Sequence, residues 1–181
     1  MHSDANPPAH TVAPPYRLRP HRPGDMGWVI SRHGALYASE YGWDMHFEAL
    51  VARIAADFID SFDSSREACW IAERNGANVG CAFLVQARDA QTKAPIAGSA
   101  QLRMLLVEPS ARGLGLGREL VAECERFARE RGYQRIVLWT NSLLLAARAI
   151  YQSAGYQMLT SQPHCSYGHD LVGETWQLDL R

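Results

Sequence analysis

The stretch QLRMLLVEPSARGLGLGR, residues 101–118, decides the fold. Its first seven residues form a largely apolar run that is typical of a buried central strand. Gly113, Gly115 and Gly117 alternate in the loop that follows, and a helix with apolar residues on one side is expected from about Gly117 to Arg131. Glycine lets backbone N–H groups approach a ligand closely, and a helix start adds unpaired donors and a positive dipole end. The stretch therefore predicts a strand, a pyrophosphate-binding loop and a helix.

Two nucleotide-binding patterns do not fit the glycine-rich loop. A Walker loop requires Gly-Lys-Ser/Thr, whereas Gly117 is followed by Arg118 and Glu119. A dinucleotide fingerprint requires the spacing Gly-x-Gly-x-x-Gly, whereas these glycines are spaced two and two. Arg112 and Arg118 bracket the turn, where each is suited either to charge-assisted bonds with an anion or to simple exposure to solvent.

The remaining chain carries the periodicity of further strands and helices around this stretch. Asp25 is expected to cap the first helix, Asn75-Gly76 predicts a tight turn between two strands, and residues 89–99 are expected to form a polar connection. The further predicted strands are 16–19, 68–73, 79–85, 135–140 and 174–180. The further predicted helices are 25–42, 45–62 and 142–154. This order predicts a mixed α/β sheet with helices on its faces.

The composition is that of one soluble globular domain. The chain has 181 residues, of which 47% are hydrophobic and 20% charged, so that a single core is expected. The formal net charge is −1, from which we expect no binding to nucleic acid or to anionic membranes. No apolar run is long enough to span a membrane, and no secretory signal is present, so a cytoplasmic location is expected. Residues 1–15 are expected to form a disordered tail before a domain spanning 16–181.

The cysteines and histidines do not predict a disulfide framework or a metal site. The four cysteines lack any Cys-x-x-Cys spacing, and three of them lie in apolar runs, so they are predicted to be reduced thiols, mostly in the core. His164 and His169 flank Cys165, but no second pair of ligands completes a tetrahedral site there. We therefore expect no bound metal.

The segment from Arg112 to Gly117 resembles the Arg/Gln-x-x-Gly-x-Gly/Ala segment with which the GNAT acyltransferase superfamily holds the pyrophosphate of acetyl-CoA. Residues 100–157 resemble that superfamily's signature region closely, and the rest of the chain resembles it in element order. Residues 26–180 further resemble the acetyltransferase half found fused to MarR-type regulators, although transcriptional regulation is not expected without a DNA-binding domain. The resemblance implies a GNAT-like, mostly antiparallel mixed sheet with two splayed parallel strands and helices on both faces.

The resemblance also implies where acetyl-CoA, the cosubstrate, would bind. Main-chain groups of Leu105 and Val107 would hold the pantetheine arm and polarise the thioester carbonyl. Tyr151 would be the general acid that protonates the departing thiolate, or else a structural tyrosine that closes a helix. Asn141 would cap that helix or bond the cofactor. The expected cofactor-binding residues are Leu105, Leu106, Val107, Arg112, Gly113, Leu114, Gly115, Leu116, Gly117, Arg118, Asn141 and Tyr151.

The sequence defines the general base and the acceptor site less clearly than the cofactor site. Many relatives place a carboxylate on the central strand where this chain has Gln101, so Glu48, Glu40 or a water chain are the candidates for the base. The acceptor, a small-molecule or peptide amine, is expected to contact Tyr41, Trp43, Glu48 and Trp139. Two functions follow: an N-acetyltransferase that works by direct attack of the amine, and a non-catalytic acyl-CoA-binding sensor. The resemblance is also compatible with a homodimer.

Overall fold

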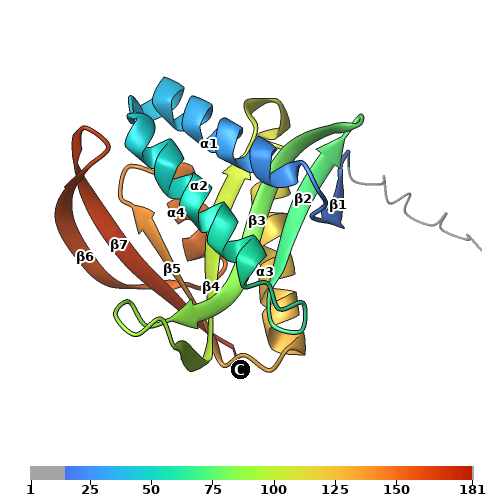
Figure 1. Cartoon of the computed structure of the whole chain (residues 1–181), viewed down its shortest axis with the longest axis vertical. Helices are drawn as coiled ribbons and strands as arrows, with labels where there is room; N and C mark the ends of the chain where they lie inside the picture. Colours follow the sequence, from blue (N-terminus) through green and yellow to red (C-terminus); the bar gives the residue numbers. More distant parts are fainter. Residues whose placement is uncertain (1–14, 181) are drawn as a thin grey trace, which may run out of the picture.

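The computed structural model describes residues 15–180, which form one seven-stranded sheet in the order β1-β2-β3-β4-β5-β7-β6 (Figure 1). The strands are β1 (Arg17–Pro20), β2 (Ala68–Arg74), β3 (Ala77–Arg88), β4 (Pro95–Val107), β5 (Arg135–Asn141), β6 (Gln157–Ser166) and β7 (His169–Asp179). The helices are α1 (Asp25–Tyr41), α2 (Met45–Asp60), α3 (Leu116–Glu130) and α4 (Leu145–Ser153). The tail expected over residues 1–15 lies, except for Pro15, outside the described residues.

The only parallel pair in this sheet is β4 with β5, and it is short. Its register covers residues 99–102 of β4 and 135–138 of β5, although both strands continue beyond it. Where the pairing stops, Met104 has a φ of 53°, a left-handed conformation that is uncommon for residues other than glycine. The register between β3 and β4 shifts at the same place, and the Cys81 thiol donates to the Met104 carbonyl at 3.2 Å. The predicted mixed sheet with two splayed parallel strands is confirmed.

The core consists of two apolar clusters, one on each face of the sheet. On one face, α1 and α2 pack on β2 and β3 through fully buried residues such as Val51, Ile71 and Phe83. On the other face, α3 and α4 pack around Leu120 and Ile136. Figure 1 shows α1 and α2 crossing the near face of the sheet while α3 lies behind it. The predicted helices on both faces are therefore present, and no helix within residues 15–180 is long and apolar enough to cross a membrane.

The sequence does not predict strand β6, which lies at one edge of the sheet. Nearly all of its residues are exposed, it contains Pro163, and it lacks the alternation that marks a half-buried strand. Its partner β7 begins at His169, five residues before the predicted start of the final strand at Glu174. The turn between the two strands places Tyr167 and Gly168 at positive φ.

Two other boundaries differ from the prediction. The polar connection expected over residues 89–99 is shorter, because β3 runs to Arg88 and β4 begins at Pro95. Helix α4 begins at Leu145 rather than near Ser142, because residues 142–144 form a turn after β5. Short strand extensions and turns carry little hydrophobic periodicity, so boundaries of this kind are hard to predict from sequence.

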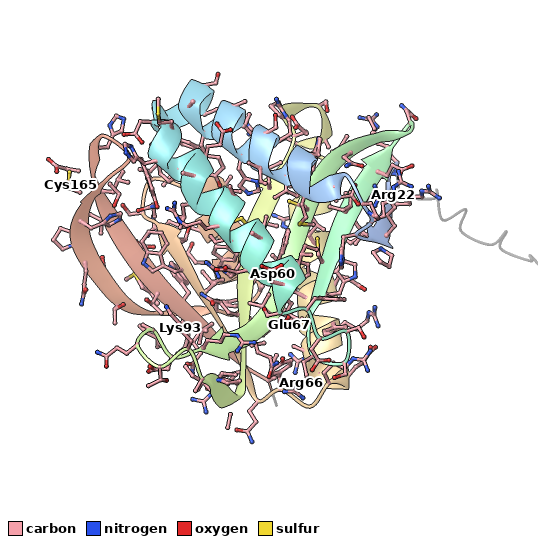
Figure 2. The ribbon with its side chains drawn as sticks, viewed as in Figure 1. Arg22, Asp60, Arg66, Glu67, Lys93 and Cys165 are labelled. Carbon is pink, nitrogen blue, oxygen red and sulfur yellow. The ribbon has the colours of Figure 1, made fainter. Side chains whose placement is uncertain are left out.

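The four cysteines are free, as predicted. Cys69, Cys81 and Cys124 are buried in the core, where burial raises the pKa of each thiol. Cys165 is exposed at the outer end of the β6–β7 hairpin (Figure 2). The first three thiols therefore serve as small apolar core groups.

Asp25 does not cap α1, contrary to the prediction. The cap position is Gly24, and the Asp25 carboxylate is buried between β1, α1 and β3 instead. It accepts hydrogen bonds from Arg19 at 2.7 Å, from the Arg22 backbone N–H at 2.8 Å and from the Asn78 amide at 3.0 Å. Burial opposes its ionisation, but these donors prevail and lower the pKa of Asp25 from 3.8 to about 2.

We expect Asp25→Ala to lower the free energy of unfolding by about 3 kcal/mol, because it leaves the buried guanidinium of Arg19 without one of its partners. The depressed pKa means that the unfolded chain binds this proton more readily than the folded chain, so stability falls as the pH falls from about 4 to about 2. Urea unfolding at about pH 7 and about pH 3 should therefore show a smaller pH dependence for the variant. A wild-type pH dependence in Asp25→Ala would contradict this assignment, and exposed Asp60→Ala is the control.

Candidate functional site

Two cavities lie where β4 separates from β5. The outer cavity, about 440 Å³ in volume, is lined by the end of β4, the glycine-rich loop, and residues of α1 and α4. The inner cavity, about 150 Å³, lies on the other side of Leu105, and six aromatic side chains are part of its lining. The two cavities share Tyr37, Leu105, Leu144 and Ala147. A long ligand held in the outer cavity would therefore present its end at the entrance of the inner one.

The three glycines of the loop have two different roles. Gly113 and Gly115 have φ values of 77° and 79°, and no protein atom lies within 4 Å of where a Cβ would be placed on either. Gly115 is the cap residue of α3, so the unpaired N–H groups of the first turn lie beside it. A Cβ on Gly117 would instead meet Ile150 Cδ1 at 2.7 Å. The first two glycines thus shape the loop, and the third allows α3 to pack closely against α4.

Two arginines line the outer cavity together with this loop. Arg112 forms an ion pair with Glu40 of α1, with 2.7 Å between Nη2 and Oε1, and the Arg112 side chain is 48% exposed. Arg118 lies on the first turn of α3 and is exposed. Leu114 is the one loop residue among the predicted set whose side chain is not in the lining. The outer cavity thus combines backbone donors at a helix start with two guanidinium groups, a set suited to a diphosphate.

The inner cavity is an aromatic enclosure. Trp43 packs on Phe47 and Tyr167, with ring centroids 4.7 and 4.8 Å away, and Tyr37 packs on Phe47 at 4.7 Å. Trp139 closes one side, where it is 48% exposed and lies against Gly173. Within residues 15–180, no aspartate or glutamate lines this cavity. Its walls therefore offer aromatic surface to an apolar group and, within the described residues, no counter-charge to a cation.

Tyr151 and Asn141 both line the inner cavity. Tyr151 is 5% exposed, and none of the residues that the structure describes hydrogen-bonds to its hydroxyl. Burial raises the pKa of Tyr151 above its ordinary value, so the phenol holds its proton at neutral pH. Asn141 is the last residue of β5, and its Oδ1 lies 2.9 Å from His164 Nε2. It does not cap α4, whose cap position is Leu144, so the capping alternative is wrong.

The two glutamates considered as general bases do not line the inner cavity. Glu40 lines the outer cavity and is held by Arg112. Glu48 is exposed on α2, where it lies beside Gly34 of α1, and it lines neither the outer nor the inner cavity. Of the four residues expected to bind the acceptor, Trp43 and Trp139 line the inner cavity, and Tyr41 lines the outer one.

Several inner-cavity residues are missing from the prediction, and three of them bear on its chemistry. His33 is buried, its Nδ1 donates to the Val29 carbonyl at 2.8 Å, and burial lowers its pKa to about 4, so the imidazole is neutral. Tyr167 reaches the cavity from the unpredicted β6–β7 turn. Arg103 alternates with Gln101 on β4, and this alternation of polar residues within an apolar strand was the available signal.

The comparisons with known proteins agree with this geometry. Residues 30–156 match the family model described as "Acetyltransferase (GNAT) family". The chain is 34% identical over 124 residues to N-acetyltransferase family 8 member 7 from Mus musculus, a match that covers 67% of this chain and 52% of the relative. The chain thus spans about half the length of the curated relatives it matches.

Solved structures show the same fold. A ribosomal-protein-alanine N-acetyltransferase from Brucella melitensis matches with a TM-score of 0.71 at 21% identity, over 91% of this chain and 99% of that one. An acetyltransferase from Salmonella typhimurium, solved with its cofactor acetyl-CoA, matches with a TM-score of 0.71 at 19% identity, over 92% and 94%. The finer resemblance to acetyltransferases fused to MarR-type regulators finds no support in these comparisons. The family match and the sheet that opens between β4 and β5 together show that this chain belongs to the GNAT family of N-acetyltransferases.

Proposed function

We propose that the protein transfers the acetyl group of acetyl-CoA to a primary amine by direct attack of the amine on the thioester. The observation that carries this proposal is the junction of the two cavities at Leu105, immediately after β4 leaves β5. The outer cavity is suited to a diphosphate and an unbranched arm, and the inner cavity to an acceptor with an apolar group. The acyl carbon of a ligand that spans the junction would face the inner cavity.

The residues present fit acetyl-CoA. Backbone N–H groups at Gly113, Gly115 and the start of α3 would hold the diphosphate, with Arg112 and Arg118 beside it. The main chain of Leu105 to Val107 has no strand partner on β5 within residues 15–180, so it is available to the pantetheine arm. This assignment carries over the predicted cofactor set, except that Leu114 would contribute only main-chain groups.

Acetyl-CoA supplies an activated acyl group when bound, and the chain's own residues account for the rest of the reaction. A backbone N–H near Leu105 would stabilise the negative charge that grows on the carbonyl oxygen as the C–N bond forms. An ammonium group that enters the aromatic cavity loses hydration, which lowers its pKa and favours release of its proton to water. As the C–S bond breaks, Tyr151 would donate its phenolic proton to the thiolate and regain a proton from solvent.

A sensor that binds acyl-CoA without turnover is the second candidate. The observation that favours it is Gln101, an amide at the place on β4 where a carboxylate base would lie, together with the lack of acidic residues in the inner cavity. The names of the relatives specify several acceptors, among them a ribosomal-protein alanine, and do not select one for this chain.

Thiol release separates the two candidates. We expect calorimetry to detect acetyl-CoA binding, and a panel of amino acids, polyamines, aminoglycosides and peptides to contain at least one amine that releases CoA thiol well above the hydrolysis background. Acetylation of the amine, detected by mass spectrometry, is the matched control for hydrolysis. Tight binding without thiol release for any amine would support the sensor, and lack of binding would contradict both candidates.

A further inference from the structure

Among residues 15–180, Arg103 is the one charged residue that lines the inner cavity. It lies on β4, one residue before Met104 and two before Leu105, so its side chain begins close to the junction of the two cavities. His33, the other basic side chain of the lining, is neutral because burial lowers its pKa to about 4. The inner cavity therefore has a net positive charge.

No acidic group of the described chain neutralises Arg103 by direct contact. Its guanidinium has no ion-pair partner within 4 Å among residues 15–180, whereas Arg19, Arg32, Arg112 and Arg148 each have one. Arg103 also lines the neighbouring cavity beneath α2, whose wall includes Asp60 and Glu67 (Figure 2), and Asp57 of that wall acts on it only through space. A half-buried, unpaired guanidinium is costly, because it gives up water without gaining a partner.

A second unpaired donor lies in the same wall. Trp43 is 4% exposed, and its indole N–H is buried without a hydrogen-bond partner in the part of the chain that the structure describes. This atom has almost no exposed surface, so it offers little to a ligand in the cavity as the cavity stands. The contact open to a ligand is therefore the Arg103 guanidinium, and a ligand that pairs with it must bring acceptor oxygens.

We propose that the acceptor amine carries a carboxylate and an aromatic or bulky apolar group, as in a free amino acid with a large apolar side chain, and that Arg103 binds its carboxylate. The proposal rests on the proposed function and narrows its substrate class. The amine and carboxylate of an amino acid are a few bonds apart, which matches the closeness of Arg103 to Leu105 in the strand. Tyr37, Phe47, Trp43 and Tyr167 supply the apolar surface for the side chain.

The same observations argue against polycationic acceptors. Polyamines and aminoglycosides carry several ammonium groups, which require carboxylates or carbonyl oxygens around them. The inner cavity offers a guanidinium and, among residues 15–180, no carboxylate. Like charges at close range in a desolvated site disfavour binding by several kcal/mol.

Three amines with the same ring test the proposal: L-phenylalanine, L-phenylalaninamide and 2-phenylethylamine, at saturating acetyl-CoA. We expect kcat/KM for L-phenylalanine to exceed that of each of the other two by at least about 10-fold, the value of one charge-assisted contact. The amine of the amide is the least basic of the three, so its larger unprotonated fraction biases the comparison against the expected result.

Arg103→Gln should reduce kcat/KM for L-phenylalanine by about 10- to 100-fold and leave 2-phenylethylamine nearly unchanged, with Arg103→Lys recovering part of the loss. Calorimetry with acetyl-CoA should give wild-type affinity in both variants, which excludes general damage. Arg53→Gln is the matched control, because Arg53 is exposed on α2 and lines neither the outer nor the inner cavity.

Equal rates for the three wild-type substrates, or equal losses for all three in Arg103→Gln, would overturn the carboxylate assignment and leave the acetyltransferase proposal standing. If no amine releases thiol, the acetyltransferase proposal fails, and the carboxylate site is tested by binding alone.

That binding test is calorimetry with N-acetyl-L-phenylalanine in the presence of CoA. Loss of its binding in Arg103→Gln supports the carboxylate site, and binding equal to that of the wild type overturns it.

Discussion

Gly115→Val is expected to abolish detectable acetyl-CoA binding while the fold is retained. The φ of 79° at this position is unfavourable for a β-branched residue, so the loop would move away from the geometry that aims its N–H groups into the outer cavity. The added side chain would also project to where no protein atom lies within 4 Å, beside the proposed diphosphate site. Loss of two charge-assisted hydrogen bonds corresponds to at least about 100-fold in affinity.

Gly132→Val is the matched control for this experiment. Gly132 also has a positive φ, 72°, and open space at its Cβ position, but it lies after the far end of α3. Both variants should lose a similar amount of stability to backbone strain, of the order of 1–2 kcal/mol. Only Gly115→Val should lose acetyl-CoA affinity by calorimetry. Wild-type affinity in a folded Gly115→Val protein would disprove the loop assignment, and Arg118→Ala should weaken binding only a few-fold, because the backbone donors remain.

Tyr151→Phe is expected to reduce kcat by about 100-fold, with little change in KM for acetyl-CoA. The substitution removes the phenolic proton and keeps the ring, and a positioned acid contributes about 10²- to 10⁴-fold to such a step. The lower end is expected, because burial raises the pKa of Tyr151 and makes it a weak acid, and water can replace part of its action. A loss confined to kcat indicates an interaction that matters in the transition state.

Tyr156→Phe provides a control from the same region. Tyr156 is 4% exposed, its ring centroid lies 5.8 Å from that of Tyr151, and its hydroxyl is buried with no hydrogen-bond partner among the described residues. It lines neither the outer nor the inner cavity, so its hydroxyl should be dispensable for turnover and slightly unfavourable for stability. If both variants turn over at the wild-type rate, Tyr151 has a structural role alone.

The sequence predicts the centre of the sheet and the glycine-rich loop better than the edge of the sheet. Strand β4, the loop and α3 carry strong apolar periodicity and three glycines, and the structure places them as expected. Strand β6 is exposed along most of its length, so burial leaves no pattern in its sequence. The predicted cap at Asp25 was wrong because its carboxylate has tertiary partners on β1 and β3, which local sequence does not reveal.

The candidate site was likewise predictable only in part. Residues of the glycine-rich loop are contiguous in the chain, so their gathering around one cavity could be predicted. The inner cavity draws its walls from α1, α2, β4, β5, α4 and the β6–β7 turn, which meet only in the folded chain. Glu48 lies on α2, but its side chain lies beside α1 and not in the inner cavity. Tyr167 belongs to the turn between β7 and β6, the strand that the sequence did not predict. Long-range packing therefore determines the inner cavity, and local sequence determines much of the outer one.

The opening between β4 and β5 also bears on the solubility of the protein. Main-chain groups without a strand partner usually occur at the rim of a sheet, where another polypeptide can add to them and start aggregation. In this molecule they occur in the middle of the sheet, and α1 and α4 form the walls of the cavity in front of them. An added strand needs free space about 4.8 Å from its neighbour along its whole length. An unbranched ligand, in contrast, can enter the opening by one end. The sheet thus keeps hydrogen-bonding groups available to a small molecule while it withholds them from other proteins.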